Sequence, residues 1–110
     1  FEVVHISQFL MELIEEGRLE LKGTYSKKLT FHDPCYLGRH NGEYDAPRRL
    51  LGLVEGAELH EMADHREGSL CCGGGGGRIW MDTPLKERFS NLRVEQARAT
   101  GAEVLVTACP

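Results

Sequence analysis

Hydrophobic positions along the chain follow two different periods, and both occur near its start. Residues 2–6 contain three β-branched residues in five, which predicts a short buried strand. The next apolar residues have helical spacing and form one stripe along a helix: Phe9, Leu10, Leu13 and Ile14. We expect Ser7 to cap this helix and Gly17 to end it.

The middle of the chain predicts a second strand and a second helix. Residues 29–32 alternate between apolar and polar, and Pro34 ends this strand because it cannot donate to a ladder of hydrogen bonds. The Asp-Ala-Pro motif at 45–47 combines a capping aspartate with a proline in the first helical turn. The pattern therefore predicts a short helix that ends near Gly52 or Gly56.

The rest of the chain continues the alternation of strands and helices. Residues 57–62 give a weaker strand prediction. Asp82 offers a helix cap, and the apolar spacing of Leu85, Phe89 and Leu92 predicts a helix that runs to about Thr100. Residues 104–106 are a continuous apolar run, typical of a parallel strand buried on both faces. Alternating strands and helices predict an α/β fold, with a small parallel or mostly parallel sheet and flanking helices.

Length and composition exclude several classes of protein. The chain has 110 residues, which is enough for one domain with one modest core. Its apolar runs are too short to span a bilayer, and no signal peptide pattern is visible. The formal net charge of −4 argues against affinity for nucleic acid based on net charge. With only four cysteines and no secretory signal, thiols or metal ligation are favoured over disulfides, and we expect a cytoplasmic location.

The four cysteines follow predicted strands. Cys35 comes after the strand at 29–32, Cys71 and Cys72 come after the weaker third strand, and Cys109 comes after the last strand. In a parallel sheet, the carboxyl ends of the strands share one edge, where open α/β folds place their ligand sites. We therefore expect the four sulfurs to converge there, as a soft metal or an iron–sulfur cluster requires.

A run of five glycines follows the adjacent cysteines. Glycine adopts positive φ without steric cost, so the run permits the sharp turn that two neighbouring ligands need. The backbone of such a run can approach an inorganic group closely and point its N–H groups at sulfur. The predicted cofactor cradle consists of Gly73, Gly74, Gly75, Gly76 and Gly77.

Other interpretations of these residues remain open at this point. Five glycines alone are more often a flexible linker. The four cysteines could ligate structural zinc, although paired Cys-x-x-Cys hooks are lacking, and adjacent cysteines could form a strained redox disulfide. His32 could support the ligands without binding metal itself. Four arginines near the cysteine loops are expected to be solvated, although their charge could stabilise thiolates: Arg39, Arg48, Arg49 and Arg78.

Three motifs together resemble the CCG domain, the cysteine-rich domain of heterodisulfide reductase subunits and related iron–sulfur oxidoreductases. They are His-Asp-Pro-Cys-Tyr-Leu-Gly-Arg at 32–39, Cys-Cys-Gly-Gly-Gly-Gly at 71–76 and Thr-Ala-Cys-Pro at 107–110. The family pattern closes with Cys-x-x-Cys, of which this chain supplies Cys109 and Pro110. Family members commonly carry two such domains after a ferredoxin-like domain. We therefore expect residues 1–110 to be a single CCG domain, the C-terminal one, of a longer oxidoreductase.

The resemblance implies a function and a set of ligands. Cys35, Cys71, Cys72 and Cys109 would ligate a 4Fe–4S cluster of the noncubane kind, with the glycine run as its cradle. The domain would transfer electrons, and a disulfide could be reduced at the cluster. Its partners would be a ferredoxin-like domain and a flavoprotein or quinone-reducing subunit, in a complex in the cytoplasm or peripheral to a membrane. The alternative is a zinc-binding structural module of the same type of complex.

Overall fold

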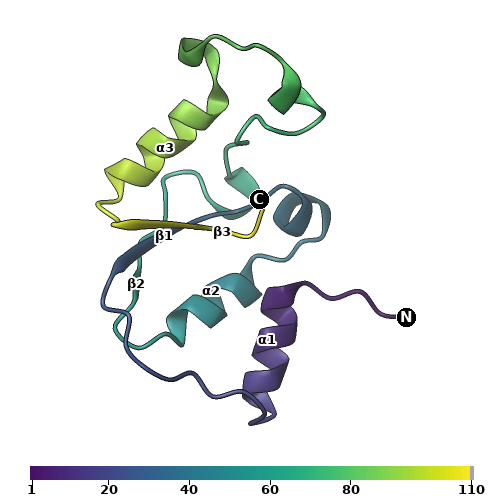
Figure 1. Ribbon diagram of the computed structural model, residues 1–110, viewed down its shortest axis with the longest axis vertical. Helices are drawn as coiled ribbons and strands as arrows, with labels where there is room; N and C mark the ends of the chain where they lie inside the picture. The colour runs from purple at the N-terminus through teal and green to yellow at the C-terminus, as the bar shows by residue number, and fades with distance from the viewer. Residues whose placement is uncertain (110) are drawn as a thin grey trace.

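The computed structural model describes residues 1–109 and contains a three-stranded parallel sheet (Figure 1). The central strand β1 (Lys28–His32) lies between β2 (Glu58–Leu59) and β3 (Val104–Thr107). Its register with β3 runs from Leu29 opposite Val104 to His32 opposite Thr107. The predicted α/β fold class is confirmed.

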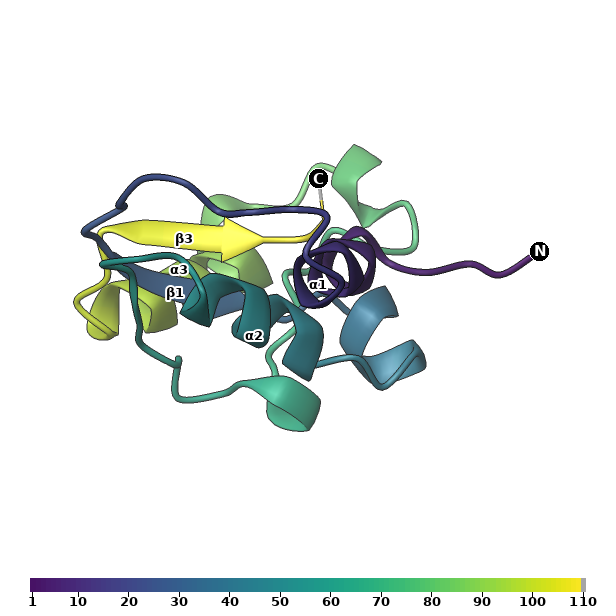
Figure 2. The same ribbon diagram turned by 90° about the horizontal axis from the view of Figure 1, so that it is seen from below.

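Helices cover both faces of the sheet. Helices α1 (Ile6–Glu15) and α2 (Asp45–Gly52) lie on one side, and α3 (Phe89–Ala99) lies on the other (Figures 1 and 2). Residues 29–32 of β1 are consequently all buried, although Thr30 and His32 are polar. The alternation of side chains in a strand directs these two toward one face and Leu29 and Phe31 toward the other.

The predicted strand at residues 2–6 is wrong. Within the described residues this segment pairs with no strand, and Val3 is exposed. The helix begins at Ile6 with His5 as its N-cap, not with Ser7. The His5 ring accepts a hydrogen bond from the Ser7 N–H (3.2 Å), and Gln8 Oε1 accepts one from the His5 N–H (2.9 Å). This reciprocal cap satisfies backbone N–H groups at the helix start, so the β-branched run stays outside the sheet.

Two other elements are shorter than expected. Strand β2 covers only Glu58–Leu59 of the predicted 57–62. Helix α3 begins at Phe89, because the segment before it forms a separate 3₁₀ turn at Leu85–Glu87. The helix at 45–52 is confirmed, although Glu43 supplies its cap through Oε1 to the N–H groups of Asp45 and Ala46.

A π-helical turn at Tyr36–His40 (η1) follows β1 directly and was not predicted. Its N-terminal neighbour is Cys35, and Leu37 and Gly38 are buried. The turn packs against a 3₁₀ turn at Arg66–Gly68 (η2), which precedes the adjacent cysteines. Among the described residues, no helix has the length and apolar content needed to cross a membrane.

Candidate metal centre

The cysteines lie where the strands end. Cys35 follows β1, and Cys109 follows β3, which runs parallel to β1 in register with it. Both residues therefore lie beyond the carboxyl edge of the sheet, as predicted. Cys71 and Cys72 reach the site through the long connection from β2 to α3.

Cys35 and Cys71 belong to separate segments but lie near each other, and Cys72 is close enough to influence Cys35. Burial raises the pKa of Cys35, and the nearby charge of Cys71 and a hydrogen bond with its thiol raise it further. Cys72 acts in the same direction, and the positive charge of Arg39 opposes these effects. All three cysteines are partly buried and free of disulfides, whereas Cys109 is exposed.

The glycine run begins with a left-handed backbone position directly after the adjacent cysteines. Gly73 has a φ of +80°, and its N–H donates a hydrogen bond to Cys71 Sγ at 3.3 Å. A Cβ atom at Gly74 would lie 3.7 Å from Cys72 Sγ, so the backbone passes close to that sulfur. These contacts match the geometry expected of a backbone that lies against a sulfur-rich group.

The donor set fits a thiolate-bound group in kind. Within residues 1–109, no three His, Cys, Asp or Glu side chains are arranged closely enough to hold a single metal ion. The available donors at this edge are soft thiols, which select zinc or iron–sulfur clusters rather than hard cations. That the four cysteines act as ligands and the glycines as a cradle therefore remains a prediction.

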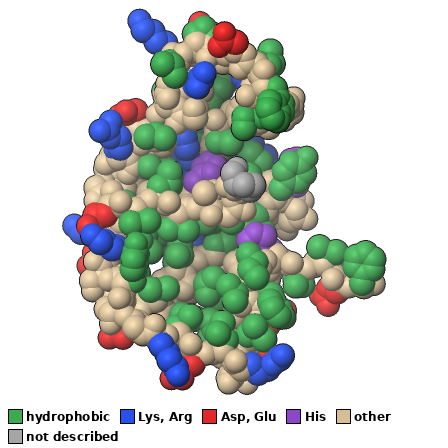
Figure 3. All heavy atoms as spheres, viewed as in Figure 1, with side chains coloured by type: hydrophobic (Ala, Val, Ile, Leu, Met, Phe, Trp, Pro, Cys, Tyr) green, Lys and Arg blue, Asp and Glu red, His purple; other side chains and the backbone are tan. Residues whose placement is uncertain are grey.

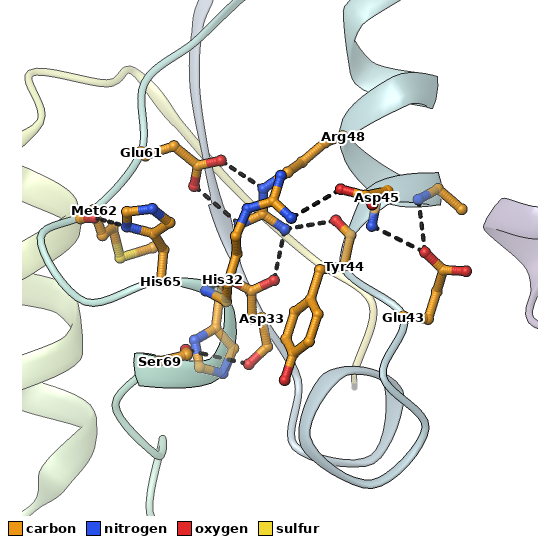
Figure 4. Close-up of polar contacts among 12 residues, drawn as sticks. His32, Asp33, Glu43, Tyr44, Asp45, Arg48, Glu61, Met62, His65 and Ser69 are labelled. Atoms are coloured by element: carbon orange, nitrogen blue, oxygen red, sulfur yellow. Dashed lines mark hydrogen bonds and ion pairs between the residues drawn. The ribbon is translucent and has the colours of Figure 1, made fainter.

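A buried ion pair anchors the segment that carries Cys35 (Figure 4). Arg48 of α2 binds Asp33 with two hydrogen bonds of 2.7 and 2.8 Å, and it also contacts Glu61 and the Tyr44 carbonyl. The Asp33 side chain is 2% exposed and accepts a further bond of 2.7 Å from the backbone N–H of Arg66. Asp33 therefore joins β1 to α2 and η2.

Hydrogen bonds offset the effect of burial on the charges of Asp33 and Arg48. Burial alone would raise the pKa of Asp33, but the hydrogen bonds from Arg48 and from the Arg66 backbone lower it overall. Burial likewise opposes the charge of Arg48, yet the bonds with Asp33 and Glu61 raise the pKa of this arginine above its ordinary value. Both groups are therefore ionised, and each stabilises the other.

A second buried arginine lies on the opposite face of the sheet. Arg93 of α3 donates from Nε to His32 Nδ1 at 2.8 Å and from a terminal nitrogen to Ser69 Oγ at 3.1 Å. Burial lowers the pKa of His32, and the charge of Arg93 lowers it further. His32 is therefore a neutral acceptor here, and its support of the metal ligands remains a prediction.

Sequence patterns missed Arg93 because the apolar stripe of its helix is not the buried face. Phe89 and Leu92 remain largely exposed, whereas Arg93 and Ala97 are buried one turn apart. The only sequence signal for this buried face was the small residue Ala97, four residues after Arg93 on the same helix. A search for apolar positions alone selects the wrong face.

The four arginines singled out from the sequence have different environments. Arg48 is buried, contrary to the expectation of a solvated position, because Asp33 and Glu61 neutralise it. Arg39 is exposed at the site and donates to the Ser69 carbonyl at 2.8 Å. Arg49 and Arg78 are exposed, and Arg49 pairs with Glu15 of α1.

Comparison with known proteins identifies the family of this fold and site. The family model of the CCG cysteine-rich domain matches residues 29–110, which contain all four cysteines. The chain belongs to this family, as its motifs suggested. Pro110, the last residue of the third motif, lies outside the residues that the structure describes.

Three curated relatives match nearly the whole chain. A "Probable membrane-anchored ferredoxin" of Chromohalobacter salexigens is 48% identical over 100% of this chain and 16% of its own length. The "Probable iron-sulfur-binding oxidoreductase FadF" of Bacillus subtilis is 42% identical over 99% and 16%, respectively. A subunit of the dihydromethanophenazine:CoB–CoM heterodisulfide reductase of Methanosarcina barkeri is 41% identical over 100% and 27%. The chain thus spans between about a sixth and a quarter of these relatives, and no solved structure matches it.

Proposed function

We propose that this chain is an electron-transfer domain of an iron–sulfur oxidoreductase, in which Cys35, Cys71, Cys72 and Cys109 ligate a 4Fe–4S cluster. The observation that carries this proposal is that Cys35 and Cys109 both follow parallel strands at the carboxyl edge of the sheet, with Cys71 of the adjacent pair near Cys35. The names of the relatives support the chemistry, since they include an iron–sulfur oxidoreductase and a heterodisulfide reductase subunit.

The chain's own residues prepare the site for such a group. A bound cluster supplies reversible electron transfer. In the metal-free protein the raised pKa of Cys35 keeps its thiol protonated, so metal binding must release that proton. The Gly73 N–H already donates to Cys71 Sγ, and the N–H groups of the following glycines would supply further donors to a bound cluster. Hydrogen bonds of this kind help to set a reduction potential.

We further propose that the chain is one domain of a longer oxidoreductase that contacts other domains or subunits. Several large hydrophobic side chains between the glycine run and α3 are exposed, and hydrophobic surface is visible on this upper loop in Figure 3. Trp80, 89% exposed, is the largest of them. Such surface marks contacts with another protein, such as a ferredoxin-like domain or a flavoprotein or quinone-reducing subunit. We expect this oxidoreductase in the cytoplasm, and the relative named as membrane-anchored supports a position at a membrane surface.

The same site is proposed as the place where a disulfide is reduced, because one relative is a heterodisulfide reductase subunit. A zinc-bound structural module is the competing function, since zinc also accepts four thiolates. Metal analysis separates the two, because an iron–sulfur cluster contains acid-labile sulfide and zinc does not.

The decisive experiment measures iron, zinc and acid-labile sulfide per chain in anaerobically purified protein. We expect iron and sulfide together, and we expect Cys72→Ser to abolish both because it removes a ligand. Met81→Ser is the matched control: it introduces serine at an exposed position of the same connection without changing a proposed ligand. Stoichiometric zinc without sulfide, or unchanged iron in Cys72→Ser, would contradict the proposal.

A further inference from the structure

The environment of Arg93 is unusual for a buried cation. The residue is 3% exposed, and its guanidinium is held by hydrogen bonds to four other residues. Every acceptor is uncharged: His32 Nδ1 at 2.8 Å, Ser69 Oγ at 3.1 Å, Gln96 Oε1 at 2.7 Å and the Asp64 carbonyl at 2.6 Å. Within residues 1–109 no carboxylate forms an ion pair with it, in contrast to Arg48.

Burying a guanidinium without a direct counter-charge is costly, and burial lowers the pKa of Arg93 accordingly. A hydrophobic side chain would fill a core position on α3 at lower cost. The retained hydrogen bonds therefore indicate a requirement other than packing. These hydrogen bonds require several N–H donors held in one plane, a fork that only the guanidinium of arginine provides.

The two acceptors on the side of the cysteine loops belong to different segments. His32 lies three residues before Cys35, and Ser69 lies two residues before Cys71. Ser69 makes two further contacts: its hydroxyl donates to the Asp33 carbonyl at 3.5 Å, and its own carbonyl accepts the bond from Arg39. One guanidinium thus connects the chain leading into the first ligand segment with the chain leading into the second.

We propose that Arg93 is the positioning residue of the cysteine site: its fork fixes the segment carrying Cys35 relative to the segment carrying Cys71 and Cys72. This inference deepens the proposed function, on which its relevance to cluster binding rests. Its mechanical content is independent of iron. The proposal is that α3, through Arg93 and its bonds to His32 and Ser69, sets the distance between the thiols of Cys35 and Cys71.

The test measures how closely the two thiols are held in the full chain without metal. In a Cys72→Ser, Cys109→Ser background, only Cys35 and Cys71 can form a disulfide. Glutathione disulfide oxidises this pair and yields two molecules of reduced glutathione, so two protons and two electrons are accounted for. The equilibrium constant is the effective concentration of one thiol at the other, which depends on their relative placement.

We expect Arg93→Gln to lower this effective concentration about tenfold or more, because the two segments lose their shared donor. Arg93→Lys should fail to restore it, since one ammonium cannot replace a planar fork. Arg49→Gln is the matched control and should leave it unchanged, because Arg49 is exposed and pairs only with Glu15. Ser69→Ala removes the bond from Arg93 to Ser69 and the 3.5 Å contact of the Ser69 hydroxyl with the Asp33 carbonyl, but it keeps the bond from Arg93 to His32. It should give a smaller decrease, which provides a test if Arg93→Gln does not fold.

The outcomes separate this proposal from the function it deepens. Equal effective concentrations in the parent, Arg93→Gln and Ser69→Ala proteins would overturn the role of Arg93, even if the parent with all four cysteines binds iron. Full restoration by Arg93→Lys would overturn the requirement for a fork. A lowered effective concentration in Arg93→Gln would support the role of Arg93 even if wild-type protein contained no iron, which would refute only the proposed function.

Discussion

Two arginines that are neighbours in the sequence have opposite energetic roles. Arg48 is a buried residue of α2 and forms ion pairs with Asp33 and Glu61. Its guanidinium carbon lies 5.4 Å from the centre of the Phe31 ring. Arg49 points to solvent and pairs with Glu15. Removing one partner of a buried pair leaves an uncompensated charge, whereas an exposed pair is screened by water.

Arg48→Gln is therefore expected to lower the free energy of unfolding by about 3–5 kcal/mol, because Asp33 would stay buried with its main partner lost. Arg49→Gln, the matched control, should change it by less than about 1 kcal/mol. Urea unfolding at neutral pH measures both. Similar losses in the two variants would show that the Asp33–Arg48 pair does not stabilise the fold.

At the scale of elements, the π-helical turn η1 depends on a close approach. A Cβ atom at Gly38 would lie 2.5 Å from Cε1 of Tyr44, a side chain that is itself buried. The Tyr44 carbonyl accepts a bond of 2.8 Å from Arg48. The absence of a side chain at Gly38 therefore lets η1 pack against the start of α2.

Gly38→Ala should destabilise the protein by about 1–3 kcal/mol, since the Tyr44 ring must move inside a packed region. Gly52→Ala provides the comparison: it lies at the end of α2, and no atom is within 4 Å of the place that an added Cβ would occupy. Alanine favours helix over glycine, so this variant should be neutral or more stable by up to about 1 kcal/mol. Thermal unfolding of both variants checks the contrast, and a stable Gly38→Ala protein would contradict it.

Elements were predictable where local signals and tertiary packing agree. The strand before Pro34 and the helix at 45–52 follow from backbone restrictions that hold in any context. The strand expected at 2–6 does not form, because its β-branched residues pair with no strand among the described residues. Instead, His5 and Gln8 cap a helix that begins at Ile6. Nothing in the local pattern distinguished η1, whose geometry depends on the Gly38–Tyr44 contact.

In the whole molecule, the sheet edge brings together residues that are distant in sequence. Parallel pairing of β1 with β3 was enough to place Cys35 and Cys109 at one edge, and this part of the site was predictable. The polar network behind the cysteines was not, because it consists of long-range contacts such as Arg93 to His32 and Arg48 to Asp33. A single polar residue has no regular spacing along the sequence, so sequence patterns do not show which distant residue it contacts.

The glycine run lies between the cysteines and α3 and contacts that helix at one position. Gly73 has a φ of +80°, and a Cβ atom there would lie 3.1 Å from Cβ of Phe89, the first residue of α3. Arg93 follows one turn later on the same helix. A side chain at Gly73 would therefore press on the helix that holds the His32–Ser69 link.

Gly73→Ala should lower the free energy of unfolding by about 2–5 kcal/mol, the sum of left-handed backbone strain and overpacking against Phe89. We also expect it to lower bound iron per chain, because the turn after Cys72 and the position of α3 both change. Gly75→Ala is the control for stability only, because Gly75 also belongs to the proposed cradle: its φ is not positive and no atom lies within 4 Å of an added Cβ. Metal analysis and urea unfolding on both proteins test this. Equal iron content and equal stability would mean that the run tolerates side chains at either position, as a flexible linker would.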